Sequence, residues 1–183
     1  MKKAGTGDLL LYMLGPAVVS FCVPVYSRKN LLQKNFLAVV IGVLTASLSG
    51  LFGAAAYARL LNFESNVIRI SCLPRFITTA LAIPATNILG GNVPMAAALV
   101  VVTGIFAGTV GPATVDFFGI KNPISRGLSI GGAGNALGAA SMIPEADAFP
   151  FAISAMILTA ATVTSLVSIP AVRDALLSLA TGK

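Results

Sequence analysis

Two arginines and a glycine-rich run are the parts of this chain that could most readily bind a ligand. Arg75 is followed by residues 76–115, none of which is charged, and Arg126 stands shortly before the run Gly131–Asn135. A guanidinium group binds a carboxylate through two parallel hydrogen bonds. A helix broken at the glycine-rich run would present unpaired backbone N–H groups and the positive end of a half-helix dipole, and Asn135 would add a neutral amide. Together these groups predict a binding site for a small carboxylate anion.

The polar residues that follow Arg75 are expected to line the same site. The predicted substrate-binding residues are Arg75, Thr78, Thr79, Asn87, Arg126, Gly131, Gly132, Gly134 and Asn135. A purely structural role stays open as the alternative for these side chains. Both arginines could extend to lipid headgroups or contact helix ends, and the threonines and Asn87 could form hydrogen bonds between helices.

The chain offers little to an enzyme, a cofactor or a metal ion. It has no His, and its 6 acidic residues all stand near the ends of expected membrane segments. No carboxylate pair, metal-ligand cluster or Ser/His/Asp set can be assembled from these residues. The spacing of Gly132–Gly138 is similar to that of a nucleotide-binding loop, but that motif requires a preceding strand. We therefore expect no enzymatic activity, no cofactor and no metal site.

The composition is that of an integral membrane protein. Hydrophobic residues make up 56% of the chain, charged residues 10%, and the mean hydropathy is +0.92. Uncharged intervals cover residues 35–58, 76–115, 127–144 and 148–172, each near or above the roughly 20 residues with which a helix crosses a bilayer. A membrane β-barrel would need alternating strands, and runs such as LVVVTGIFAGTVG do not alternate. The predicted fold is an all-α, polytopic transmembrane helix bundle of about five or six membrane segments in a single domain, 1–183.

Proline, glycine and charged residues divide the chain into its expected membrane segments. These are residues 8–26, 36–61, 67–89, 94–117, a broken or re-entrant helix over 124–143, and 149–169, followed by an amphiphilic tail. If all of them are full crossings, basic residues fall on both sides of the membrane, against the usual bias. The conflict is reduced if 67–89 is a hairpin or half-helix, because the loop of Lys121 then joins the side of Arg28. The sequence leaves the orientation open.

The net charge of +6 does not indicate nucleic-acid binding. Arg28, Lys29 and Lys34 stand in a short loop between two expected spans, where basic residues set membrane orientation. Phosphate binding would need a clustered basic face outside the bilayer. Cys22 and Cys72 lie in apolar surroundings, so we interpret them as small buried hydrophobes and expect no disulfide.

Four successive blocks of the chain resemble the signatures of the LrgB family. They are GDLLLYMLGPAVVSFCVPVYSRKNLL, SCLPRFITTALAIPATNILGG, VVVTGIFAGTVGP and IKNPISRGLSIGGAGNALGAA, in the same order and with similar spacing. The blocks LPRFITTALA and SIPAVRDALLSLA look closer to the plastid branch than to the bacterial one. The resemblance implies a multi-span inner-membrane protein. Bacterial members are associated with control of murein hydrolases and lysis beside an LrgA partner, and plastid members with exchange of glycolate and glycerate across the inner envelope in photorespiration.

Two features depart from the family pattern. Family members usually carry a His within the glycine-rich break, and this chain has Asn135 there. An Asn keeps the hydrogen-bonding capacity but cannot titrate near neutral pH, so coupling or selectivity could differ. Family chains also begin with hydrophobic helices that precede the GD–GPA segment, and we expect this chain to lack them.

The leading hypothesis is a membrane transporter or exchanger of small monocarboxylates such as glycolate and glycerate. The alternative is an antiholin-like membrane subunit that modulates murein hydrolase export and lysis with an LrgA-type partner or fused domain. Small-residue faces at Ala46–Gly53 and Gly104–Gly108 would suit such an assembly or a homo-oligomer, and also simple packing. The expected location is the chloroplast inner envelope for a plastid-type protein and the plasma membrane for a bacterial one.

Overall fold

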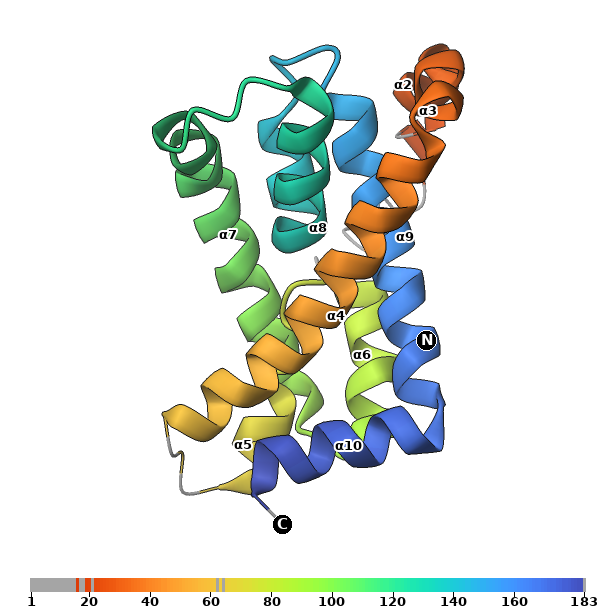
Figure 1. The fold of residues 1–183 in the computed structure, drawn as a ribbon. Helices are drawn as coiled ribbons and strands as arrows, with labels where there is room; N and C mark the ends of the chain where they lie inside the picture. The colour runs from red at the N-terminus through yellow and green to blue at the C-terminus, as the bar shows by residue number, and fades with distance from the viewer. Residues whose placement is uncertain (1–15, 17–18, 21, 62, 64, 183) are drawn as a thin grey trace, which may run out of the picture.

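The computed structural model describes residues 16, 19–20, 22–61, 63 and 65–182 (Figure 1). Its described helices are α2 (Cys22–Ser27), α3 (Lys29–Lys34), α4 (Phe36–Leu60), α5 (Asn66–Ser71), α6 (Thr79–Leu89), α7 (Val93–Phe117), α8 (Pro123–Ser141), α9 (Phe149–Ser168) and α10 (Pro170–Thr181). No strand occurs within this part of the chain. The predicted all-α bundle is therefore confirmed. Most of the first expected span, 8–26, lies outside the described residues, and α2 covers its end.

Three of the described helices, α4, α7 and α9, are long and apolar enough to cross a membrane. Their bounds agree with the expected spans 36–61, 94–117 and 149–169 to within a residue. On α7, the apolar side chains of Val102, Ile105 and Phe106 are exposed. Such an apolar outer face fits contact with lipid rather than with water.

The polar segment 67–89 does not form one helix. It divides into α5, a non-helical turn over residues 72–78, and α6, which begins after Thr78 in an extended conformation. The backbone N–H of Asn92, just beyond α6, donates to Oγ of Ser71 at the end of α5 over 2.7 Å. The chain thus leaves α5 and returns to it, as in the hairpin that the charge distribution favoured. We call residues 66–92 the first hairpin.

The glycine-rich segment forms a second hairpin, residues 123–145. Within α8 only Asn135 has non-helical dihedral angles, with φ 51° and ψ −150°. A Cβ added to Gly138 would lie 2.8 Å from the carbonyl oxygen of Ile130, so the chain beyond Asn135 folds back along the first leg. The side chains of Arg126 and Glu145 are joined by hydrogen bonds, which brings the two ends of the hairpin together. The predicted break in this helix is confirmed.

The two hairpins enter the bundle from opposite ends (Figure 1). The second occupies the upper half of the view and the first occupies the lower half, while α4, α7 and α9 pass both. Arg28 pairs with Asp147 over 2.9 Å, which places the loop between α2 and α3 at the end where the second hairpin starts. The loop of Lys121 lies at that same end, in agreement with the interpretation of segment 67–89 as a hairpin.

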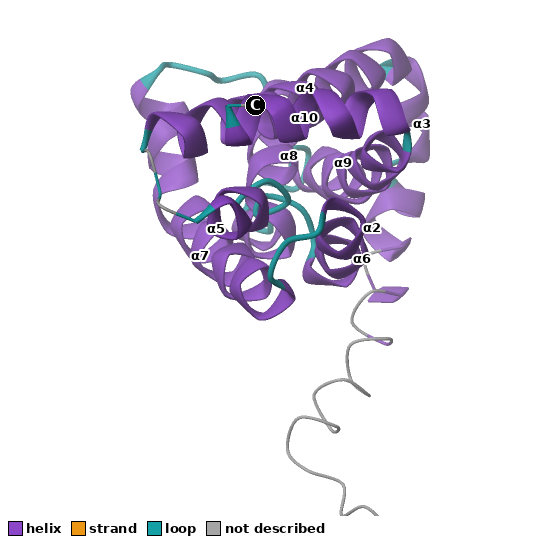
Figure 2. Cartoon of the chain, turned by 90° about the horizontal axis from the view of Figure 1, so that it is seen from below, coloured by secondary structure: helices purple, strands orange, loops and turns teal. Residues whose placement is uncertain are grey.

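The core is centred on α9 and continues into α10. Phe151, Ile153 and Val163 of α9 are fully buried, as are Leu176 and Ala180 of α10. Figure 2, which views the molecule from below, shows α10 lying across the end of the bundle that is lowermost in Figure 1. The amphiphilic tail expected after Pro170 is therefore a helix that covers the base of the first hairpin, and it fits the membrane interface.

Candidate functional site

A cavity of about 390 Å³ lies where the two hairpins approach each other. It is lined by Ala46, Ser49, Gly50, Gly53, Ala54 and Tyr57 of α4, Arg75 and Phe76 of the first hairpin, Thr103 of α7, and Gly132 and Ala133 of the second hairpin. Two predicted site residues, Arg75 and Gly132, which are far apart in the sequence, thus line one cavity. The size falls within the range of about 300–1,000 Å³ that is usual for small-molecule sites.

Arg75 supplies the positive charge of this cavity. It is half-buried in the turn between α5 and α6, directly after the buried Pro74. Among the residues that the structure describes, no carboxylate pairs with it. Its guanidinium carbon lies 6.0 Å from the ring centre of Tyr57, a separation at which the ring attracts a cation only weakly. The guanidinium is therefore available for an anion.

The start of α6 adds to the positive character of the turn. Thr78 is the N-cap residue of α6, and its side chain makes no capping hydrogen bond. The first amides of a helix have no partner within the helix and carry the positive end of its dipole. Thr78 follows Arg75 by three residues, so the start of α6 and Arg75 belong to the same turn of the first hairpin. Thr79, the first residue of α6, is exposed.

The glycines of the second hairpin do not provide the unpaired backbone N–H groups that the sequence predicted. Gly131, Gly132 and Gly134 have helical dihedral angles, so their amides belong to the helix and are not freed by the break. They lie at the C-terminal end of the first leg, which presents carbonyl oxygens and negative dipole. The prediction of free N–H groups at Gly131–Gly134 was therefore wrong, because the amides of these glycines lie within the helix. Whether these glycines contact substrate stays a prediction.

Instead, these glycines let helices approach closely. A Cβ on Gly131 would collide with the backbone of Ala152 in α9, and a Cβ on Gly134 would lie 2.5 Å from Cβ of Ala107 in α7. On the cavity side, a Cβ on Gly132 would meet Cβ of Ala46 at 3.0 Å. The hairpin therefore fits between three helices only because it lacks these side chains.

Asn135 fixes the tip of the second hairpin. Its Nδ2 donates to the carbonyl of Val100 over 2.9 Å, and its Oδ1 accepts from the amide of Leu137 over 3.1 Å. The residue is buried, and its Oδ1 would lie 2.6 Å from a Cβ placed on Gly104 of α7. Asn135 thus holds the turn against α7, and its predicted contact with substrate stays a prediction.

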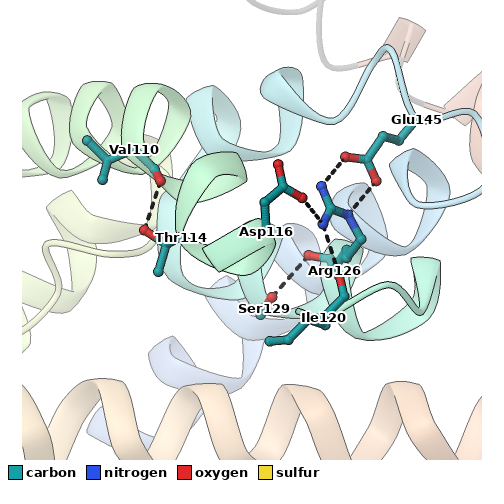
Figure 3. A network of polar contacts seen from close by, with 7 residues as sticks. All are labelled: Val110, Thr114, Asp116, Ile120, Arg126, Ser129 and Glu145. Carbon is teal, nitrogen blue, oxygen red and sulfur yellow. Dashed lines mark hydrogen bonds and ion pairs between the residues drawn. The ribbon is translucent and has the colours of Figure 1, made fainter. Parts of the chain in front are cut away.

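Arg126 lies near the start of the second hairpin in a network of polar contacts (Figure 3), and it is not among the residues that line the cavity. It donates to both carboxylate oxygens of Glu145 over 2.7 and 2.6 Å, to Oδ1 of Asp116 over 2.5 Å, and to the carbonyl of Ile120 over 3.0 Å. It precedes Asn135 by nine residues, which is about 13 Å along a helix. A substrate carboxylate would have to displace one of its acidic partners, so its predicted role in binding stays a prediction.

Asn87 also lies apart from the cavity. It is exposed on α6, eight residues after Thr79, or about 12 Å along the helix. Its neighbour Thr86 is buried and donates its hydroxyl to the carbonyl of Ala82 in the same helix. Of the predicted site residues, the structure brings Arg75 and Gly132 together at the cavity, and it leaves Asn87 exposed on α6.

Sequence reasoning missed three polar residues of the cavity, Ser49, Tyr57 and Thr103. Thr103 had a detectable signal, because it is an isolated polar residue in the apolar run VVVTGIF. Ser49 and Tyr57 gave none, because similar residues recur along α4 and only the fold shows which of them face the hairpins. Among the described residues, no group of three His, Cys, Asp or Glu side chains could hold a metal ion.

Comparison with known proteins identifies the family. The model of the LrgB-like family matches residues 4–173. The chain belongs to the LrgB-like family. It is also 32% identical over 177 residues to the plastidal glycolate/glycerate translocator 1, chloroplastic, of Arabidopsis thaliana. That alignment covers 96% of this chain and 34% of the relative, so the chain spans about a third of the length of the translocator. No solved structure matches the chain.

Proposed function

We propose that this LrgB-like chain forms the substrate site of a membrane transporter or exchanger for small monocarboxylates such as glycolate and glycerate. The observation that carries the proposal is the cavity between the two hairpins, in which Arg75 has no acidic partner among the described residues. The Arabidopsis relative, which is named a glycolate/glycerate translocator, supports the same substrate class.

The charge of the cavity favours an anion with one carboxylate. Arg75 is the cationic residue among its lining side chains, and none of those side chains is acidic. A guanidinium group can hold one carboxylate through two hydrogen bonds, and the uncapped start of α6 adds partial positive charge. The remaining lining is mostly Ala, Gly and Phe, which suits a small organic group and does not pair with a second charge.

The arrangement of the hairpins suits alternating access. Discontinuous helices that meet near the middle of a membrane commonly form the binding sites of secondary transporters. Here each hairpin is anchored at one end of the bundle, so movement of either one would open the cavity to that end. In this proposal Arg126 is a positioning residue that holds the second hairpin through Glu145 and Asp116.

The antiholin-like subunit is the second candidate. Gly104 and Gly108 of α7, which could have bound a partner helix, already contact the second hairpin. A Cβ added to Gly53 of α4 would meet no described atom within 4 Å, but Gly53 lines the cavity assigned to substrate, so this open space does not mark a separate surface for a partner helix. Recovery of an LrgA-type protein with the purified chain would favour this alternative.

Radiolabelled glycolate counterflow tests the proposed function. Purified protein is reconstituted into liposomes preloaded with glycerate, and uptake is compared with that of protein-free liposomes, with and without a pH gradient. We expect counterflow that requires internal glycerate, and dependence on the gradient would add proton coupling despite Asn135. Folded protein that neither binds nor exchanges glycolate would contradict the proposal.

A further inference from the structure

We propose that Thr103 selects carboxylates that carry an oxygen substituent on the carbon next to the carboxyl group. The inference rests on the proposed function, because it assumes that the carboxylate itself is held by Arg75. It adds the residue that recognises the 2-substituent and so separates 2-hydroxy and 2-oxo acids from unsubstituted acids of the same chain length.

The hydroxyl of Thr103 differs from those of its neighbours on α7. Membrane helices usually satisfy Thr and Ser hydroxyls with the carbonyl one turn earlier. Thr109 and Thr114 follow this rule, donating to the carbonyls of Ile105 and Val110 over 2.8 Å each. Thr103 makes no hydrogen bond with any residue that the structure describes, although it is half-buried. Its hydroxyl is left for a ligand.

Thr103 lines the cavity, so its unpaired hydroxyl is available to a ligand there. Thr103 and Arg75 line the same cavity, from α7 and from the first hairpin respectively. Ser49 also lines it, but its hydroxyl already donates to the carbonyl of Thr45 over 2.6 Å. Tyr57 has a hydroxyl as well, but its side chain is exposed and its ring lies beside Arg75. Thr103 is therefore the half-buried hydroxyl best able to meet the second functional group of a substrate.

A threonine hydroxyl suits both kinds of 2-substituent. It accepts a hydrogen bond from a hydroxyl substituent and donates one to a carbonyl substituent. An unsubstituted acid such as acetate would leave the Thr103 hydroxyl without a partner. A neutral hydrogen bond of this type corresponds to a difference of about tenfold in affinity.

Equilibrium competition on the full chain in lipid nanodiscs tests the assignment. Radiolabelled glycolate is the probe, and glycolate, glyoxylate and acetate are the competitors. In Thr103→Val we expect the preference for glycolate over acetate to fall about tenfold, while the affinity for acetate stays unchanged. Thr103→Ser should restore the preference. Thr109→Val is the matched control on the same helix, because its hydroxyl is bound to its own backbone, and it should leave the preference unaltered.

The outcomes separate this inference from the function on which it rests. Arg75→Gln should weaken glycolate and acetate together and leave their ratio unchanged. If folded Thr103→Val retains the wild-type ratio, or if Tyr57→Phe lowers the ratio instead, the assignment of Thr103 is wrong while carboxylate binding stands. If the folded wild-type protein binds neither acid, the proposed function falls together with the inference.

Discussion

Arg126 and Glu145 join the two ends of the second hairpin through paired hydrogen bonds of 2.7 and 2.6 Å. The guanidinium of Arg126 is almost buried, with 11% of its side chain exposed, and Asp116 at the end of α7 binds the same group. One arginine thus connects α7, the start of α8 and the loop that precedes α9. The hairpin tip near the cavity is positioned from this distant anchor.

Removing the charge of Glu145 should loosen the anchor. Glu145→Gln replaces a charge-assisted pair with a neutral one and is expected to lower the free energy of unfolding by about 2 kcal/mol. Asp147→Asn is the matched control, because its ion pair with Arg28 is exposed and should contribute less than about 1 kcal/mol. Denaturant titration in detergent micelles measures both. Equal effects of the two substitutions would contradict the anchor role.

Because Asn135 has a positive φ, Gly should be less destabilising than Ala at this position. Asn135→Gly loses the hydrogen bonds to Val100 and Leu137 but accommodates φ 51° without strain, whereas Asn135→Ala loses them and adds strain. We expect both variants to be destabilised, with Ala worse than Gly by about 1 kcal/mol. Thermal unfolding followed by circular dichroism ranks them. A more stable Ala variant would show that the backbone at the tip is helical.

Two glycines on different long helices provide a test of hairpin packing. Gly104→Ala would place Cβ 2.6 Å from Oδ1 of Asn135, so α7 and the hairpin tip would have to separate. We expect a loss of about 1–3 kcal/mol in stability. Gly53→Ala in α4 meets nothing within 4 Å and should be neutral or slightly stabilising, because Ala favours a helix. Similar losses in both variants would mean that α7 does not pack on the hairpin as described.

Unlike the destabilising substitutions above, removal of the buried hydroxyl of Thr159 should raise the stability of the protein. Its Oγ1 is buried without a hydrogen-bond partner among the described residues, next to Gly132. Thr159→Val removes this unsatisfied group at nearly constant volume and should stabilise the protein by about 1 kcal/mol. Thr86→Val is the comparison, because the buried Thr86 hydroxyl is already bound to Ala82 and gains nothing from removal. A destabilised Thr159→Val would indicate that the hydroxyl has a partner.

The fold could be predicted from the sequence largely because the bilayer limits the choices. Long uncharged intervals correctly indicated α4, α7 and α9, since each must satisfy its backbone within one helix. The glycine-rich run correctly indicated a break, but for a different reason. The glycines allow close packing against α7 and α9, and the non-helical residue is Asn135.

The site was harder to foresee because it depends on contacts between distant segments. From the sequence, Arg126 was as good a candidate for binding a carboxylate as Arg75. Only the closed hairpin shows that Arg126 is already paired with Glu145, nineteen residues later. Local sequence contains no information on that pairing. Thr103 was overlooked because a lone Thr in an apolar helix is usually bound to its own backbone, and the fold was needed to show that this one faces a cavity.

In the proposed transporter, Arg75 holds the carboxylate of the transported acid. Glycolate counterflow in proteoliposomes should therefore be compared between Arg75→Gln and Arg173→Gln, the latter removing an arginine of α10 that pairs with the neighbouring Asp174. We expect Arg75→Gln to reduce counterflow at least about tenfold, because a charge-assisted bidentate contact is lost, and Arg173→Gln to leave it near the wild-type rate. Wild-type counterflow in correctly folded Arg75→Gln would contradict the account.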